Sequence, residues 1–229
     1  MMVRIMLIGW LAAAIVPAAT AQAPFPLSPP PALRNAGFEE PAVPPGAAEF
    51  PRPEGWSCFA SVPGEKIAVT ATGARSGAQA LVFPPVPAHN AFEGAAQEFP
   101  VQPGHHYEFA VHARSDSADR LAADSFGQIH FEWRGADGKE VSRTYGPTWA
   151  AGLSAKQWER FFVEGDAPER AVSGLAVIMF YSRNGGGRGT FYVDDCQFTG
   201  GPPPQAAGDP GSTSRMQRLE KFRQARGSR

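Results

Sequence analysis

The feature that most constrains the fold of this chain is an alternation of large apolar residues with mostly polar ones in two central segments. These segments are residues 105–115 and residues 126–134. Their alternate apolar positions are Tyr107, Phe109 and Val111 in the first segment, and Ile129, Phe131 and Trp133 in the second. Successive side chains of a β-strand point to opposite faces, so each segment predicts a strand with one face in a core.

The rest of the central sequence fits the same fold class. Short runs of Val, Ile, Phe, Tyr and Trp are separated by Gly, Pro and Asp, and long helical patterns are absent. This is typical of a β-sandwich or barrel. We expect one all-β domain over residues 33–199, with a hairpin turn at 136–138 and room for a helical turn only at 116–125. The predicted strands are residues 34–39, 56–61, 67–72, 79–83, 95–101, 105–115, 126–134, 139–145, 158–164, 172–181 and 190–199.

The N-terminus has the pattern of a secretory signal peptide over residues 1–21. Arg4 supplies a positive charge, residues 5–16 are apolar, and Ala19 and Ala21 form a small-x-small cleavage site. The alternative is an uncleaved membrane anchor, although the apolar run is shorter than the roughly 20 residues of a spanning helix. We therefore expect export to the periplasm or the extracellular space, with a proline-rich linker at residues 22–32.

The C-terminal segment, residues 200–229, differs in composition and charge from the domain. A Pro/Gly-rich linker precedes a basic tail in which Met216, Leu219 and Phe222 recur at three-residue spacing, as in a short helix. From Gly201 onward there are six Lys or Arg against two acidic residues. Such a tail either contacts an anionic surface or stays solvated. Export and the acidic excess of residues 22–200 argue against nucleic acid as a partner.

Six short elements, in order along the domain, resemble the galactose-binding-like jelly-roll sandwiches, a fold of many carbohydrate-binding modules. The elements are Asn35 to Glu39, Gly55-Trp56, Gly73 to Gly77 with Ala80-Leu81, Gln97 with Val101, Pro103, Gly104 and Tyr107, Trp158 with Phe161-Phe162, and Tyr192 to Asp195. The resemblance implies a two-sheet antiparallel jelly-roll β-sandwich that binds a glycan or polysaccharide.

The same resemblance implies one structural calcium ion near the first and last strands. Glu39 and Asp194 would supply side-chain oxygens, and Arg75 or Ser76 a backbone oxygen. Oxygen ligands of this kind suit calcium. The alternative is that Glu39 is a surface carboxylate and that Asp194 pairs with an arginine.

Cys58 and Cys196 are the only cysteines of the chain. Two cysteines in an oxidising compartment favour one disulfide, and first and last strands often lie close together in such sandwiches. The alternative is two separately buried thiols.

In sandwiches of this family a sugar lies across one face or at the loop edge, against aromatic rings and a few polar groups. If the alternating apolar residues face the core, the polar residues between them form an outward face, which is otherwise an ordinary solvated surface. Trp56, Trp133 and Trp158 are expected in the core. The candidate ligand-binding residues are His112, Arg114, His130, Glu132 and Arg134, with Tyr145, Trp149 and Tyr181 for stacking.

The sequence lacks familiar catalytic motifs. Gly-x-Ser-x-Gly does not occur, and the glycine-rich residues 184–189 lack the Lys and Ser or Thr of a phosphate loop. No pair of carboxylates stands out as the acid and base of a glycosidase. We therefore expect a non-catalytic binding protein that recognises a carbohydrate. The alternatives are a protein–protein interaction or adhesion module and, less favoured, a β-sandwich glycan hydrolase or lyase.

Overall fold

The computed structural model describes residues 32–203, except for residues 45, 48–49, 65, 87, 123 and 184–186. The signal peptide, nearly all of the N-terminal linker and the whole basic tail lie outside the described residues, so their assignments stay predictions. Within the described part no helix is long and apolar enough to cross a membrane.

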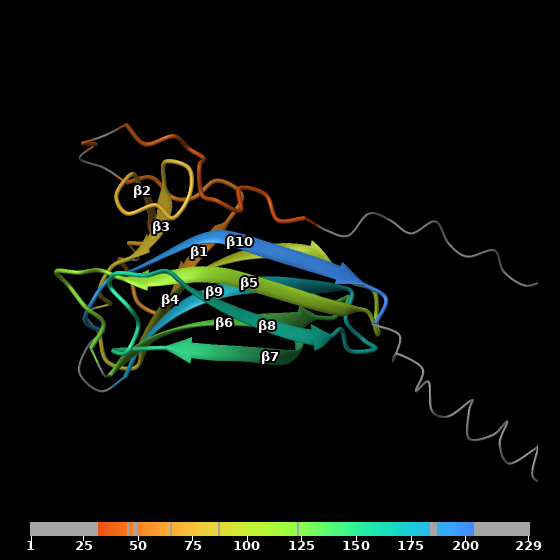
Figure 1. Cartoon of the computed structure of the whole chain (residues 1–229). Coiled ribbons are helices and arrows are strands. Elements are labelled where there is room, and N and C mark those ends of the chain that lie inside the picture. Colours follow the sequence, from red (N-terminus) through yellow and green to blue (C-terminus); the bar gives the residue numbers. More distant parts are fainter. Residues whose placement is uncertain are drawn as a thin grey trace, which may run out of the picture.

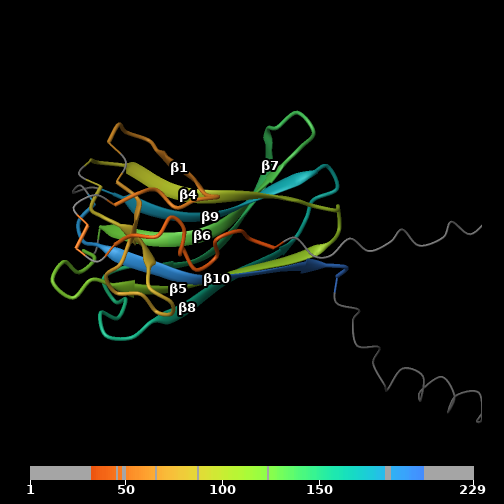
Figure 2. The same ribbon diagram turned by 90° about the horizontal axis from the view of Figure 1, so that it is seen from above.

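Two five-stranded antiparallel sheets face each other and form a jelly-roll sandwich, which confirms the expected fold class (Figures 1 and 2). Sheet A has the order β1-β4-β9-β6-β7, and sheet B has the order β2-β3-β10-β5-β8. The strands of sheet A are β1 (Ser57–Ala60), β4 (Ala91–Pro100), β9 (Ser173–Ser182), β6 (Ser125–Arg134) and β7 (Glu140–Trp149). The strands of sheet B are β2 (Ala68–Thr70), β3 (Ala80–Phe83), β10 (Phe191–Gly201), β5 (His106–Ser115) and β8 (Glu159–Asp166).

The alternating residues fill the space between the sheets as expected. Tyr107 and Phe109 of β5 are buried against Phe131 and Trp133 of β6, and Phe99 of β4 contacts three of these four rings. Burial of large aromatic side chains from both sheets supplies much of the free energy of folding. The outward residues of each strand are thereby held on a rigid sheet.

Three local expectations were wrong. Residues 34–37 form a turn rather than a strand, closed by the hydrogen bond from Phe38 N to Asn35 O, and both Asn35 and Phe38 have positive φ. Residues 116–125 contain no helical turn among those described. Trp158 is only partly buried, because it stacks on the Arg114 guanidinium outside sheet B instead of entering the core.

Candidate functional site

Five residues on the outer face of sheet A form a polar cluster with one exposed ring, which we call the Glu132 cluster. They are His130, Glu132 and Arg134 of β6, and Arg143 and Tyr145 of β7. Antiparallel pairing places His130 opposite Tyr145 and Glu132 opposite Arg143. Directly opposite residues in a sheet have neighbouring side chains, so the register itself assembles the cluster.

The Glu132 carboxylate lies at the centre of this cluster. Its Oε1 accepts from His130 Nε2 at 3.5 Å and pairs with Arg143 at 2.8 Å, and its Oε2 accepts from Arg134 at 3.3 Å. The hydrogen bond from His130, with the nearby arginines, lowers the pKa of Glu132 to about 2 although burial opposes this. Glu132 is therefore ionised at neutral pH.

Tyr145 is the exposed ring of the cluster, with 60% of its surface accessible. Its ring lies 5.6 Å from the His130 ring, and the Arg143 guanidinium lies over it at 5.7 Å. Arg143 is in turn bound by Glu140, with the closest N–O distance 2.6 Å. These contacts hold the tyrosine ring in place while its outer side faces solvent, which is the arrangement needed for stacking on an apolar ligand face.

Trp149, a predicted stacking residue, is buried and cannot contact a ligand on this face. It is the last residue of β7, is 3% exposed, and packs against Phe161 and Phe191. The reason is a β-bulge: Gln128 pairs with Thr148 and His130 with Tyr145, so β7 has one residue more than β6 over this stretch. The extra residue reverses the alternation after Tyr145. The Gly146-Pro147 pair was the indication in the sequence that β7 is irregular at this point.

His112 and Arg114 lie on the opposite side of the sandwich from the Glu132 cluster, so the expectation of one shared face was wrong. They belong to β5 of sheet B, whereas His130, Glu132 and Arg134 belong to β6 of sheet A. Alternation along a strand tells which residues point outward, but not from which sheet. Arg114 is stacked between Trp158 and Tyr192 at 5.3 Å from each ring.

Tyr181 lies on the outer face of sheet A but away from the Glu132 cluster. It pairs with Phe126 of β6, with ring centroids 5.1 Å apart. His130 lies four positions after Phe126, which corresponds to about 13 Å along a strand. Tyr181 and the Glu132 cluster would contact the same ligand only if it extends along the sheet.

The expected calcium ligands are close to one another in space. The loop of residues 75–79, however, points backbone N–H groups at the two carboxylates, whereas a cation needs oxygen atoms. Asp194 Oδ2 accepts the backbone N–H groups of Arg75 and Ser76 at 2.8 and 3.2 Å. Glu39 accepts those of residues 78 and 79, and a side chain at Gly77 would collide with its carboxylate. Calcium needs several oxygen ligands. No group of three or more His, Cys, Asp or Glu suited to a metal occurs among the described residues. This arrangement does not fit the ion.

Cys58 and Cys196 are not joined to each other, so the expected disulfide is absent from this structure. Cys58 lies in β1, an edge strand of sheet A, whereas Cys196 lies in β10 inside sheet B. Burial strongly raises the pKa of the Cys196 thiol. The first and last strands of this sandwich belong to different sheets and do not pair with each other.

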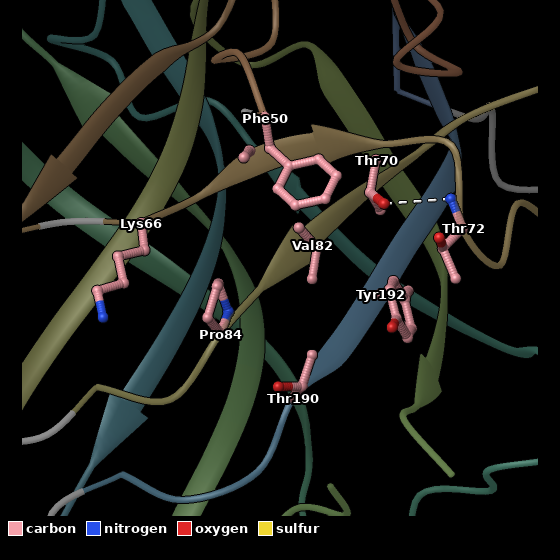
Figure 3. A pocket seen from close by; sticks show the side chains of 9 residues that line it. Phe50, Lys66, Thr70, Thr72, Val82, Pro84, Thr190 and Tyr192 are labelled. Atoms are coloured by element: carbon pink, nitrogen blue, oxygen red, sulfur yellow. Dashed lines mark hydrogen bonds between the residues drawn. The ribbon is translucent and has the colours of Figure 1, made fainter. Parts of the chain in front are cut away.

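A pocket of about 550 Å³ on the outer face of sheet B was not anticipated from the sequence (Figure 3). Its lining residues come from β2, β3, β10 and the segments next to them. They are Phe50, Lys66, Ala68, Thr70, Thr72, Val82, Pro84, Thr190 and Tyr192. Phe50 and Lys66 lie outside every strand, so strand alternation gave no indication of them.

Neither a protein-family model nor a curated protein sequence matches the chain. Among solved structures, a cyclase from Fischerella sp. TAU in complex with 4-(1H-indol-3-yl)butan-2-one has a TM-score of 0.55 at 16% identity, covering 78% of this chain and 100% of the cyclase. The CBM22-1 xylan-binding domain of Paenibacillus barcinonensis Xyn10C has a TM-score of 0.50 at 16% identity, covering 73% and 93%.

The enzymatically active domain of bacteriophage CBA120 tailspike protein 4 matches with a TM-score of 0.49 at 11% identity, over 64% of this chain. The chain spans only 19% of the length of that protein. At such identities, likeness to a cyclase and to a xylan-binding domain establishes a shared sandwich fold and nothing finer. The narrower resemblance to galactose-binding-like modules stays a prediction.

Proposed function

We propose that this chain is an exported, non-catalytic binding protein that recognises a carbohydrate on the outer face of sheet A. The observation that carries the proposal is the Tyr145 ring, exposed to solvent yet held by His130 and Arg143 beside the charged groups of the Glu132 cluster. Carbohydrate sites combine an aromatic ring, which stacks on the apolar face of a pyranose, with polar groups that bind its hydroxyls.

The polar part of the Glu132 cluster suits hydroxyl recognition. The ionised Glu132 carboxylate accepts hydrogen bonds, and the guanidinium groups of Arg134 and Arg143 donate them. Hydrogen bonds to charged groups are roughly twice as strong as those between neutral groups. A pyranose stacked on Tyr145 would therefore find both acceptors and donors at its edge.

The pKa of Glu132 also supports binding without glycoside hydrolysis. A general acid must carry a proton at the working pH, which in glycosidases requires a raised pKa. Glu132 has a pKa of about 2 and is fixed in ion pairs with Arg134 and Arg143. A carboxylate in that state is an electrostatic anchor for neighbouring donors.

Two further lines of support come from outside the cluster. A xylan-binding domain shares the fold over most of both chains. The sequence pattern of residues 1–21 supports export, which is where a glycan-binding protein meets polysaccharides. Export is tested by expressing the full chain in a Gram-negative host: the exported protein should begin at Gln22. A full-length protein retained in the membrane would contradict this.

The test of function is a glycan array probed with the full chain, followed by calorimetry on the glycans that bind. Tyr145→Ala should weaken binding by about tenfold or more, which corresponds to about 1.4 kcal/mol. Phe162→Ala is the matched control, because Phe162 is a comparably exposed ring, 44% accessible, on sheet B. No binding to any glycan, equal losses in both variants, or hydrolysis of bound glycans would each overturn the proposal. Capture of a stable protein partner through Tyr145 would instead support the adhesion alternative.

A further inference from the structure

The pocket on sheet B is separate from the Glu132 cluster and is built from different elements. Ala68 and Thr70 of β2, Val82 of β3 and Tyr192 of β10 form its floor, and Phe50 lies over Val82 (Figure 3). These residues face outward, since their strand neighbours Val69, Leu81 and Val193 are buried in the core. The two surfaces therefore lie on opposite sides of the sandwich. A volume of about 550 Å³ falls within the range of small-molecule sites.

The charge of the pocket is positive at one end. Among the described residues that line the pocket, Lys66 alone is charged, and it lies at one edge of the pocket (Figure 3). Its backbone N–H is held by Glu93 Oε2 at 3.3 Å, but its ammonium has no ion-pair partner in the described part of the chain. An exposed cation at the edge of a concave site favours an anionic group of a ligand.

The opposite end of the pocket is closed to anions. Tyr192 OH donates to Asp116 at 2.8 Å, and Thr190 Oγ1 donates to Asp119 at 2.8 Å. Burial, together with the hydrogen bond to Asp116, raises the pKa of Tyr192 to about 12, so its hydroxyl keeps its proton. The two carboxylates behind these hydroxyls repel negative charge. A ligand with one anionic end would therefore orient that end toward Lys66.

Two aromatic rings and two threonines lie between these ends. Phe50 is 52% exposed, and the Tyr192 ring is held from behind by the Arg114 guanidinium at 5.3 Å. Thr70 Oγ1 accepts from Thr72 N at 3.1 Å, which leaves its own proton and the Thr72 hydroxyl for a ligand. Rings that offer apolar faces, together with nearby hydroxyls, match the alternating C–H faces and hydroxyl edges of a pyranose.

We propose that this pocket is a second carbohydrate site, specific for a sugar unit that carries a carboxylate, such as a uronic acid. The carboxylate binds Lys66, the pyranose face lies against Phe50, and the hydroxyls meet Thr70 and Thr72. This site does not depend on binding at the Glu132 cluster, and either site can exist without the other.

The experiment is calorimetry on the full chain with trimers of galacturonic, mannuronic and glucuronic acid. The methyl ester of each trimer serves as the neutral control. At least one acid trimer should bind, and its ester should bind about tenfold more weakly. Lys66→Gln should reduce the affinity for the acid to that of the ester without changing the ester. Phe50→Ala should weaken both ligands about tenfold.

The matched controls are exposed residues of the same types away from the pocket. Lys139→Gln, in the β6–β7 hairpin, and Phe162→Ala, on β8, should leave binding unchanged. The proposal is overturned if no acid trimer binds, if esters bind equally well, or if Lys66→Gln has no effect. Loss of uronate binding in Tyr145→Ala would also overturn it, because the sugar would then occupy sheet A. Failure of the sheet A proposal, in contrast, leaves these results unaltered.

Discussion

Tyr145 lies directly opposite His130 across the β6–β7 pair, with the two ring centroids 5.6 Å apart and the tyrosine ring facing solvent. The bulge follows at once, so the next aromatic residue of the strand, Trp149, faces the core. One extra residue in β7 thus leaves Tyr145 at the surface and turns Trp149 into the core. The two positions can be altered separately.

Gly127→Ala should destabilise the domain without removing the exposed Tyr145 ring. The Trp149 side chain packs directly against Gly127, and a Cβ there would overlap the indole ring. Overpacking of this kind costs about 1–3 kcal/mol. Urea unfolding followed by tryptophan fluorescence measures the loss. Gly152→Ala is the matched control, since nothing lies within 4 Å of a Cβ at that position. Equal stability of the two variants would show that Trp149 does not pack as described.

The acid stability of the domain should depend on Glu132. Its pKa is about 2 in the folded protein and near 4.5 in the unfolded chain. A carboxyl group whose pKa is lowered in the folded protein stabilises the fold at pH values above its pKa in the unfolded chain. This contribution is lost as the pH falls from about 4.5 through 2. The contribution of Glu132 to the free energy of unfolding amounts to about 3 kcal/mol at most.

The Glu132→Gln variant should therefore have a lower free energy of unfolding than the wild type at pH 7, and this difference in free energy should narrow toward pH 2. Urea unfolding of both proteins between pH 7 and pH 2 measures the difference. Asp116 and Asp195, whose pKa values are also lowered, are present in both proteins and cancel in the difference. Glu108→Gln, which removes an exposed pair with Arg160, serves as the control and should show little effect. A difference in free energy of unfolding that stays constant across this pH range would contradict the lowered pKa of Glu132.

Strand alternation predicted the core and the direction of most side chains, since it depends only on local backbone geometry. It placed Phe109 and Phe131 inside, and His130 and Glu132 outside. It could not tell that β5 and β6, consecutive along the chain, belong to different sheets. That assignment depends on long-range pairing, and His112 was consequently placed on the wrong side.

Strand alternation also failed to place two other parts of the candidate sites, for different reasons. The sequence predicted a strand that ends at residue 145, so Trp149 was placed on the following loop, whereas β7 continues through the bulge and turns Trp149 into the core. Phe50 and Lys66 reach the sheet B pocket from segments outside the strands, where no periodicity indicates direction. Irregular backbone is where alternation ceases to be informative.

A chelator should not change the thermal melt of the domain. Asp194 and Glu39 are already satisfied by backbone N–H groups of residues 75–79, and Arg75 pairs with Asp195 beside them. Scanning calorimetry with excess EDTA and with added calcium measures this on the full chain. A melting temperature that falls in EDTA and recovers with calcium would show that the loop turns its carbonyl oxygens toward a bound ion.

Both cysteines should remain reduced in the purified, exported protein. Cys58 is partly buried in β1, and Cys196 is buried in β10 of the other sheet. The raised pKa of Cys196 keeps it as the thiol, which is the unreactive form. Denaturation without reductant should release two titratable thiols, and the intact mass should not change on reduction. Under native conditions an alkylating reagent should modify Cys58 before Cys196. An increase of two hydrogens in mass on reduction would establish a bridge and contradict this prediction.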